Sequence, residues 1–396
     1  MARRTEWLDA KAATHLLDVN RATLYAYVSR GYVRSEPVPG RPRERRYARE
    51  DVERLRLRAE ERRNPEKAAA NALRWGVPIL ESSITLIADG KLYYRGQDAC
   101  ALARTRSLEE VAALVWCGAS DSDIFDTPLH VISGLSGPDL PFVNRAQSVL
   151  PLVAARDELA FDLRARSVAQ TGWRIVNLLT SVGAASQDLE ATVEETLARE
   201  WAPKKKDAAK VIRAALIVCA DHELNVSAFT ARCVASAASN PYAVVIAGLA
   251  ALEGTKHGGA TARVDALWRE LRRSRDVRAN VAERLRRGET IDGFGHPLYP
   301  NGDPRAALLL DMLPKSAELT FARNLAESVE SVLGEKPTLD FALVAVERVL
   351  DLPRGSALAL FAIGRTIGWV AHAIEQYGQD AMIRPRAKYV GPKPEK

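Results

Sequence analysis

The fold is decided by the stretch Ile291–Arg305, IDGFGHPLYPNGDPR, which holds three glycines and three prolines in fifteen residues. A regular helix or strand would not tolerate that many breakers, so we predict a loop. The apolar side chains of Phe294 and Tyr299 favour an ordered loop over a disordered one. His296 is the side chain here that titrates near neutral pH, and Arg305 leads into an apolar run. Together these features predict a site for an anionic substrate.

The composition bounds the class of protein. The chain has 396 residues, of which 47% are hydrophobic, and this is enough for about two or three domains with packed cores. Met1–Thr5 shows no apolar signal core, so we expect a cytoplasmic protein. The apolar segment Ser356–Ile374 contains Arg365, with Gly364 and Gly368 at small-xxx-small spacing, and therefore predicts a buried helix rather than a membrane span. Four cysteines without metal-type spacing predict buried, reduced thiols: Cys100, Cys117, Cys219 and Cys233.

The charge is concentrated at one end of the chain. Residues 1–63 hold 16 Lys and Arg against 10 Asp and Glu, a net of +6, which equals the net charge of the whole chain. Residues 64–396 are therefore balanced, at 40 against 40. A basic module of this size predicts an anionic partner that binds at one place, rather than nonspecific electrostatic binding over the whole surface.

Within this module the pattern predicts two short helices joined by a tight turn. Asp9 is placed to cap a helix over Ala10–Leu17, and Asn20 to cap a second one over Arg21–Ser29, with Gly31 closing it. Residues 36–47 suit a basic wing or β-hairpin, and a charged helix over residues 49–63 is expected to follow. This order is the helix-turn-helix pattern.

The run KAATHLLDVNRATLYAYVSRGYVRS, followed by RRYAREDVERL, resembles the winged helix-turn-helix of the mercury-resistance-regulator (MerR) and excisionase type. The resemblance covers residues 1–63 and implies DNA binding, with the second helix in the major groove. The alternative is a small basic helical domain that makes protein contacts or serves assembly. Asn64-Pro65 predicts the start of a helical linker over residues 64–74.

The rest of the chain, residues 75–396, reads as mostly helical. Ser83–Ile87, the Asp89-Gly90 turn and Lys91–Tyr94 predict one β-hairpin, and Ser107 with Glu110 predicts a capping box at the start of a helix ending at Trp116. Apolar residues at three- and four-residue spacing predict helices over Glu158–Leu163, Thr171–Val182, Leu189–Trp201, Asp207–Cys219 and Ser227–Ala238.

The candidate catalytic and ligand-binding residues lie beside helix-breaking and helix-capping residues. His222, His257 and His296 stand in glycine- or cap-rich contexts, whereas His15, His130 and His372 look like ordinary helix or surface residues. Asp340 is either a functional carboxylate or the N-cap of a helix over Phe341–Leu350. The arginine candidates are Arg305, Arg365 and Arg384. Arg365 stands in an apolar helix and needs a buried partner or an anionic ligand.

Several motifs in order resemble the citrate synthase family, from about Gly76 to Gly391. The resemblance implies an all-α homodimer, with a small domain of roughly residues 222–345 inserted in a large one. It also implies condensation of acetyl-CoA or propionyl-CoA with oxaloacetate, with no metal and no permanently bound cofactor. The matching motifs are VPILESSITLIADGKLYYRG, DHELNVSAFTAR, KHGGA, GFGHPLYPNGDPR, PTLDFA, LFAIGRTIGWVAHAIEQ and IRPRAKYVG.

The same resemblance implies the residue roles. Asp340 would be the base, His257 would stabilise the enol or enolate, and His296 would polarise the ketone. The ligands of the dicarboxylate would be His222, Arg305, Arg365 and Arg384, the last from the partner subunit. The chain departs from its relatives at Pro297–Gly302, which lacks the cation that meets CoA phosphates in many of them. An alternative function is a DNA-binding regulator that uses the synthase fold as a metabolite sensor.

Overall fold

A computed structural model describes residues 7–38, 40–53, 55–56, 80–118, 124–125, 140–379, 381–387, 389–392 and 394. The chain divides into two compact units, Met1–Glu81 and Ser82–Lys396. The predicted linker over residues 64–74, the last part of the charged helix and His130 lie outside the described residues.

Within its described residues, the first unit contains a small sheet, the two predicted short helices and the start of the predicted charged helix, at residues 49–53 and 55–56. Its three-stranded antiparallel sheet has the order β1-β3-β2. Both predicted helices are confirmed: Asp9 accepts a hydrogen bond from the Ala12 amide, and Asn20 accepts one from the Thr23 amide. The elements are β1 (Trp7–Leu8), α1 (Ala10–Leu17), α2 (Arg21–Ser29), β2 (Ser35–Val38) and β3 (Arg41–Ala48).

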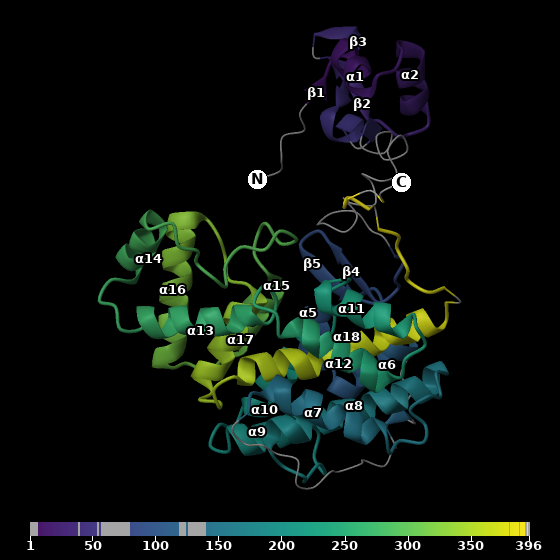
Figure 1. Ribbon diagram of the computed structural model, residues 1–396. Coiled ribbons are helices and arrows are strands. Elements are labelled where there is room, and N and C mark those ends of the chain that lie inside the picture. The colour runs from purple at the N-terminus through teal and green to yellow at the C-terminus, as the bar shows by residue number, and fades with distance from the viewer. Residues whose placement is uncertain are drawn as a thin grey trace. The chain divides into compact units, whose positions relative to one another are not determined.

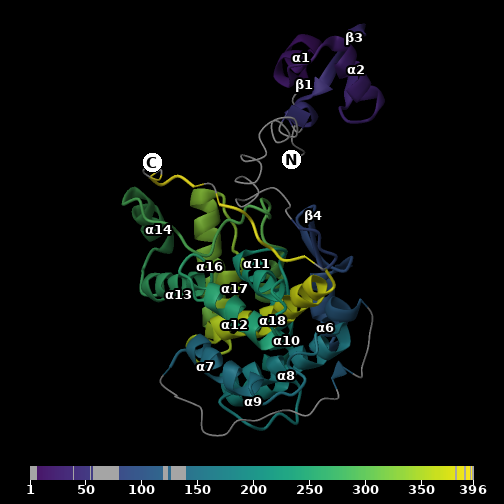
Figure 2. The ribbon, with the colours of Figure 1, turned by 45° about the vertical axis from the view of Figure 1, so that its right-hand side comes forward.

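The second unit begins with a small sheet and continues as helices, as predicted. The hairpin β4 (Thr85–Ala88) and β5 (Lys91–Tyr94) pairs antiparallel, and β6 (Gln97–Asp98) adds to β5. The helices are α5 (Ala99–Thr105), α6 (Leu108–Cys117), α7 (Phe142–Ala154), α8 (Ala165–Ala184), α9 (Val193–Trp201), α10 (Ala208–Cys219), α11 (Val226–Ala235), α12 (Pro241–Leu252), α13 (Gly259–Leu271), α14 (Val277–Arg286), α15 (Pro304–Met312), α16 (Ala317–Leu333), α17 (Leu339–Val349) and α18 (Ser356–Tyr377). Figures 1 and 2 show α13, α14 and α16 grouped away from α8 and α9.

Several local predictions were wrong for identifiable reasons. Residues 158–161 form turns rather than a helix, because Asp157 accepts hydrogen bonds from Tyr242, Arg174 and the Leu159 amide and holds the chain there. The helix expected from Leu189 begins only at Val193, since Thr192 forms a capping box with Glu195. Of the four cysteines only Cys219 is buried, and Cys117 is exposed at the end of α6.

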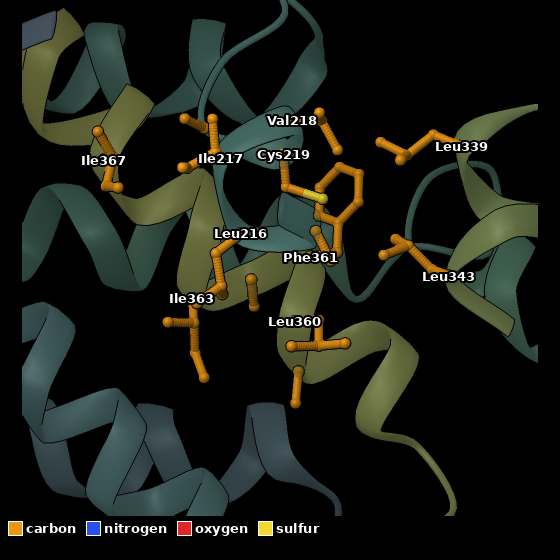
Figure 3. Packing of buried hydrophobic residues seen from close by; sticks show 14 of the residues in the cluster. Leu216, Ile217, Val218, Cys219, Leu339, Leu343, Leu360, Phe361, Ile363 and Ile367 are labelled. Carbon is orange, nitrogen blue, oxygen red and sulfur yellow. The ribbon is translucent and has the colours of Figure 1, made fainter. Parts of the chain in front are cut away.

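Helix α18 lies at the centre of the second unit. Figure 3 shows Phe361 of α18 between Cys219 of α10 and Leu343 of α17, with Ile363 of α18 beside Leu216 of α10. Helix α18 has the length and apolar composition of a membrane span, but 89% of its most apolar window is buried within the unit. It is therefore the core helix that the sequence predicted.

The two glycines of α18 explain how closely it packs on the end of α10. A Cβ atom added to Gly364 would lie 2.5 Å from the Leu216 carbonyl oxygen, and one added to Gly368 would lie 2.3 Å from that of Ala220. Any larger residue would push the two helices apart. The small-xxx-small spacing thus serves a helix contact, which brings Arg365 against the end of α10.

Candidate active site

The loop at residues 291–303 is ordered, and glycines shape it. Gly293 and Gly295 have φ values of 91° and 72°, a conformation that favours glycine. The Gly295 amide donates to the Lys336 carbonyl at 3.0 Å, and the Thr338 amide donates to the Gly293 carbonyl at 2.8 Å. These two bonds fasten the loop to the segment that leads into α17.

Two of the predicted histidines meet beside this loop. The rings of His222 and His296 lie 5.3 Å apart between centroids in an edge-on arrangement. The Tyr299 hydroxyl lies 3.0 Å from Nε2 of His222. Burial lowers the pKa of His222 well below its usual range, and the charges of Arg305 and Arg365 lower it further. His222 is therefore neutral at physiological pH.

His296 is held in one tautomer. The Leu298 amide donates to Nδ1 of His296 at 3.2 Å, so in the neutral ring Nε2 carries the proton. Burial lowers the pKa of His296, and the Arg305 charge lowers it further. The ring is thus a neutral hydrogen-bond donor through Nε2.

His257 stands just before α13, with its ring edge-on to Phe361 at 5.7 Å between centroids. Its Nε2 atom lies 2.9 Å from the Ser227 hydroxyl, which also lies 2.9 Å from Oδ1 of Asn225. The Ser227 hydroxyl has one proton, which its bond to Oδ1 of Asn225 uses; when that proton turns to Nε2 of His257 instead, Nδ1 carries the ring proton and becomes a donor. Burial lowers the pKa of His257 to about 4, and Arg365 adds to the shift.

Asp340 is not the N-cap that composition alone allowed. Thr338 is the N-cap residue of α17, and Asp340 lies in the first turn of the helix. Burial raises the pKa of Asp340 to about 6, against the opposing charge of Arg305. A carboxylate with this pKa is ionised at neutral pH and still accepts a proton readily.

Arg305 is bound to a neighbouring carboxylate. Its Nε and Nη2 atoms donate to the two oxygens of Asp303 at 2.9 and 2.8 Å. Asp303 also accepts the Arg305 amide, as the N-cap of α15, and the Leu339 amide at 3.0 Å. One buried carboxylate therefore links the arginine to the starts of α15 and α17. Burial opposes the charge on Arg305, but Asp303 raises its pKa above the usual range.

Arg365 has a different environment. Its side chain is 1% exposed, and its Nε atom donates to the Cys219 carbonyl at 2.7 Å. Its guanidinium lies 4.7 Å from the centre of the Phe361 ring. Nη1 is buried without a hydrogen-bond partner among the described residues. A buried donor without a partner is costly, so this atom marks a place for an anionic ligand.

Six of the seven predicted residues share one region through direct contact or charge: His222, His257, His296, Arg305, Asp340 and Arg365. The seventh, Arg384, is exposed in the segment after α18, away from regular structure. In the described parts of the chain, no group of three or more His, Cys, Asp or Glu residues is arranged to hold a metal ion.

Sequence reasoning missed several supporting residues. Ser227, the first residue of a predicted helix, lies beside His257, and Asn225 rather than Ser227 is the N-cap of α11. His372, expected to be an ordinary residue, is fully buried and lies 3.2 Å from Asp221. The DPR tripeptide could have indicated Asp303, because an aspartate just before a proline-led helix is a typical N-cap.

The first unit presents a polar face on α2. Arg21, Tyr25 and Ser29 are exposed at four-residue spacing and therefore share one side of the helix, while Leu24 is buried on the other. On the adjoining strands Arg46 pairs with Glu36, and next to them Arg34 pairs with Asp51. Arg21, the one charged residue within α2, forms no ion pair with another described residue.

The comparisons with known proteins agree with this site. The family described as "Citrate synthase, C-terminal domain" matches residues 150–386. A citrate synthase of Haloferax volcanii is 31% identical over 359 residues, which cover 80% of this chain and 95% of that protein. A 2-methylcitrate synthase of Shewanella oneidensis is 34% identical over 194 residues, 47% of this chain and 52% of that protein.

A solved structure gives the same fold. It is the ternary complex of citrate synthase from Thermoplasma acidophilum with carboxymethyl coenzyme A and oxaloacetate, which matches with a TM-score of 0.68 at 25% identity. The match covers 83% of this chain and 97% of that one. The chain therefore belongs to the citrate synthase family. It is an enzyme of the citrate synthase type, for which a coenzyme A thioester is a substrate rather than a bound cofactor.

Proposed function

We propose that the second unit condenses acetyl-CoA or propionyl-CoA with oxaloacetate, giving citrate or 2-methylcitrate and free CoA. The observation that supports the proposal is that a carboxylate of pKa about 6, three neutral histidines and two buried arginines are linked by contact or charge. Such a set suits proton abstraction beside a thioester, followed by attack on a ketone that carries two carboxylates. The 2-methylcitrate synthase among the relatives keeps propionyl-CoA open as a substrate.

Each catalytic residue then acts in one step of the condensation. Asp340 removes a proton from the carbon beside the thioester carbonyl, and His257 donates a hydrogen bond to the oxygen of the resulting enol or enolate. That carbon attacks the ketone carbon of oxaloacetate, while Nε2–H of His296 stabilises the developing alkoxide. Water then cleaves the thioester and releases CoA.

The dicarboxylate is held by cations already in place. Arg365 offers Nη1, which has no hydrogen-bond partner in the described part of the chain, Arg305 is fixed by Asp303, and the charges of both act on His222. We further propose a cytoplasmic homodimer in which Arg384 of the partner subunit completes this subsite.

Residues 297–302 lack the cation that meets the CoA phosphates in many relatives. Lys336 lies against this loop, since a Cβ atom added to Gly302 would come within 2.8 Å of its Cδ atom. Its side chain is 48% exposed, and its ammonium lies 3.6 Å from a carboxylate oxygen of Glu330. Lys336 is thus placed to meet a CoA phosphate in place of the missing cation.

The direct test is thiol release with oxaloacetate and either acetyl-CoA or propionyl-CoA. We expect CoA release with at least one thioester, and the ratio of the two kcat/KM values identifies the acyl substrate. A folded protein that binds oxaloacetate but releases no CoA from either thioester would refute the proposal.

We also propose, as a second function, that the first unit binds DNA through the exposed face of α2. Arg21, Tyr25 and Ser29 on one side of that helix favour it, together with the net charge of residues 1–63. The test is fluorescence anisotropy with a duplex from the chain's own upstream region at two salt concentrations. Arg21→Ala should weaken binding and reduce its salt dependence, whereas Lys91→Ala in the second unit should not. Equal affinity for a scrambled duplex would rule out a regulatory role.

A further inference from the structure

Asp221 is a fully buried carboxylate to which the proposed chemistry gives no role, although it directly precedes His222. Its Oδ1 atom lies 3.2 Å from Nε2 of His372 on α18. Its Oδ2 atom accepts the Thr85 hydroxyl of β4 at 2.6 Å and the Glu223 amide at 3.1 Å. A buried charge with partners from three separate parts of the chain is costly to assemble and restricts movement of all of them.

The residues on either side of Asp221 are held as well. The carbonyl of Cys219 accepts Nε of Arg365, and Gly368 allows α18 to approach the Ala220 carbonyl. The Tyr94 hydroxyl lies 3.3 Å from both the amide and the carbonyl of Asp221. The segment of residues 219–222 is therefore anchored along its whole length, and it connects Arg365 to His222.

The charge of Asp221 also matters for Arg365. Burial lowers the pKa of Arg365, and the negative charge of Asp221 opposes that shift. The described contacts of Asp221 go to Thr85, His372, Glu223 and Tyr94, not to the guanidinium. Asp221 thus supplies a counter-charge at a distance and leaves Nη1 of Arg365 available to a ligand.

We propose that Asp221 is a positioning residue for oxaloacetate. Held by Thr85 and His372, it fixes His222 and the carbonyl to which Arg365 donates, and so sets the geometry of the dicarboxylate subsite. This inference rests on the proposed function, because it concerns the same ligand. It adds the hairpin residue Thr85 and the helix residue His372 to the determinants of oxaloacetate affinity.

The test uses a conservative series at Thr85 in the full chain. Thr85→Val keeps the shape and removes the hydroxyl, and Thr85→Ser restores the hydroxyl. The control is Thr180→Val: Thr180 is fully buried, whereas Thr85 is half-buried, and the Thr180 hydroxyl donates within α8 to the Val176 carbonyl at 2.8 Å rather than to Asp221. Oxaloacetate Kd by calorimetry, CoA Kd and Tm are measured for each variant.

We expect Thr85→Val to raise the oxaloacetate Kd roughly three- to tenfold, less than a direct hydrogen bond to a charged group contributes because Thr85 acts on the ligand through Asp221, with CoA Kd unchanged. Thr85→Ser should return the Kd to the wild-type value, and Thr180→Val should lower Tm alone. His372→Gln keeps a hydrogen-bond donor and should therefore raise the oxaloacetate Kd less than His372→Leu does. Equal oxaloacetate Kd values for Thr85→Val, Thr180→Val and the wild type would overturn the inference.

The same experiment separates this inference from the proposed function. A wild-type protein that binds oxaloacetate but releases no CoA refutes only the condensation, since the Kd comparison still decides the role of Asp221. A wild-type protein that fails to bind oxaloacetate overturns both.

Discussion

The two buried arginines of the site are stabilised in opposite ways. Arg305 donates two hydrogen bonds to Asp303, so its charge is neutralised before any substrate arrives. Arg365 is equally buried but donates to a backbone carbonyl, and its Nη1 has no partner among the described residues. Arg305, on the loop side of the site, therefore contributes mainly to stability, whereas Arg365, on the α18 side, is available to bind a ligand. The difference predicts separate effects when each side is altered.

Removing the proposed base should produce the largest effect and leave both arginines intact. We expect Asp340→Asn to lower kcat by about 10²–10⁴-fold, the usual contribution of a general base. Oxaloacetate affinity should be unchanged, since neither arginine contacts the exchanged atom in the described structure. Steady-state kinetics and calorimetry check the two quantities, and a parallel loss of affinity would contradict the assignment of Asp340 to chemistry alone.

The next effect concerns stability on the loop side. Arg305→Met would leave Asp303 buried and unpaired, so we expect the free energy of unfolding to fall by about 3–5 kcal/mol in urea denaturation. Asp303→Asn in the same background should recover much of this loss, because asparagine is uncharged and still caps α15. Oxaloacetate affinity should not recover. If Arg305→Met alone were as stable as the wild type, the Arg305–Asp303 ion pair would not be needed for stability.

Substitution of Arg365, on the α18 side of the site, should affect oxaloacetate binding more than stability. Arg365→Met removes a cation that contacts no carboxylate among the described residues, so stability should fall by less than in Arg305→Met. Oxaloacetate Kd should rise by about 30- to 300-fold, because a buried charged contact to the ligand is lost. Thermal unfolding with and without oxaloacetate measures both effects. If the two methionine variants behaved alike, the contrast between the arginines would fail.

The smallest expected effect is a pH dependence. Turnover should decrease as pH falls through about 6, where Asp340 takes up its proton. Because the folded-state pKa is raised, the contribution of Asp340 to stability is complete below the unfolded pKa of about 3.9 and is lost as pH rises through about 6. Asp340→Asn should therefore melt at a higher temperature than the wild type at pH 7.5, and the difference should vanish at pH 4.

Sequence reasoning predicted the elements that depend on local chemistry. Capping residues defined α1 and α2, Asp89-Gly90 defined the β4–β5 turn, and breaker density defined the loop at residues 291–303. Each of these signals lies within a few residues of the structure that it specifies. The family resemblance then named the site residues, six of which the fold brings into one region.

The supporting contacts could not be predicted in this way. Thr85, Asp221 and His372 are separated by more than a hundred residues from one to the next, and no local pattern indicates that they meet. Ser227 carries a good capping side chain, but Asn225 takes that position and leaves the serine to His257. Such pairings follow from the packing of whole helices, which single-residue propensities do not encode.

The glycine contact between α18 and α10 has a consequence for motion. With backbone separations that leave no room for a Cβ atom at Gly364 or Gly368, neither helix has space to slide or rotate against the other. Arg365 and the segment of residues 219–222 therefore keep one relative position, because the Cys219 carbonyl that accepts Nε of Arg365 cannot shift along α18.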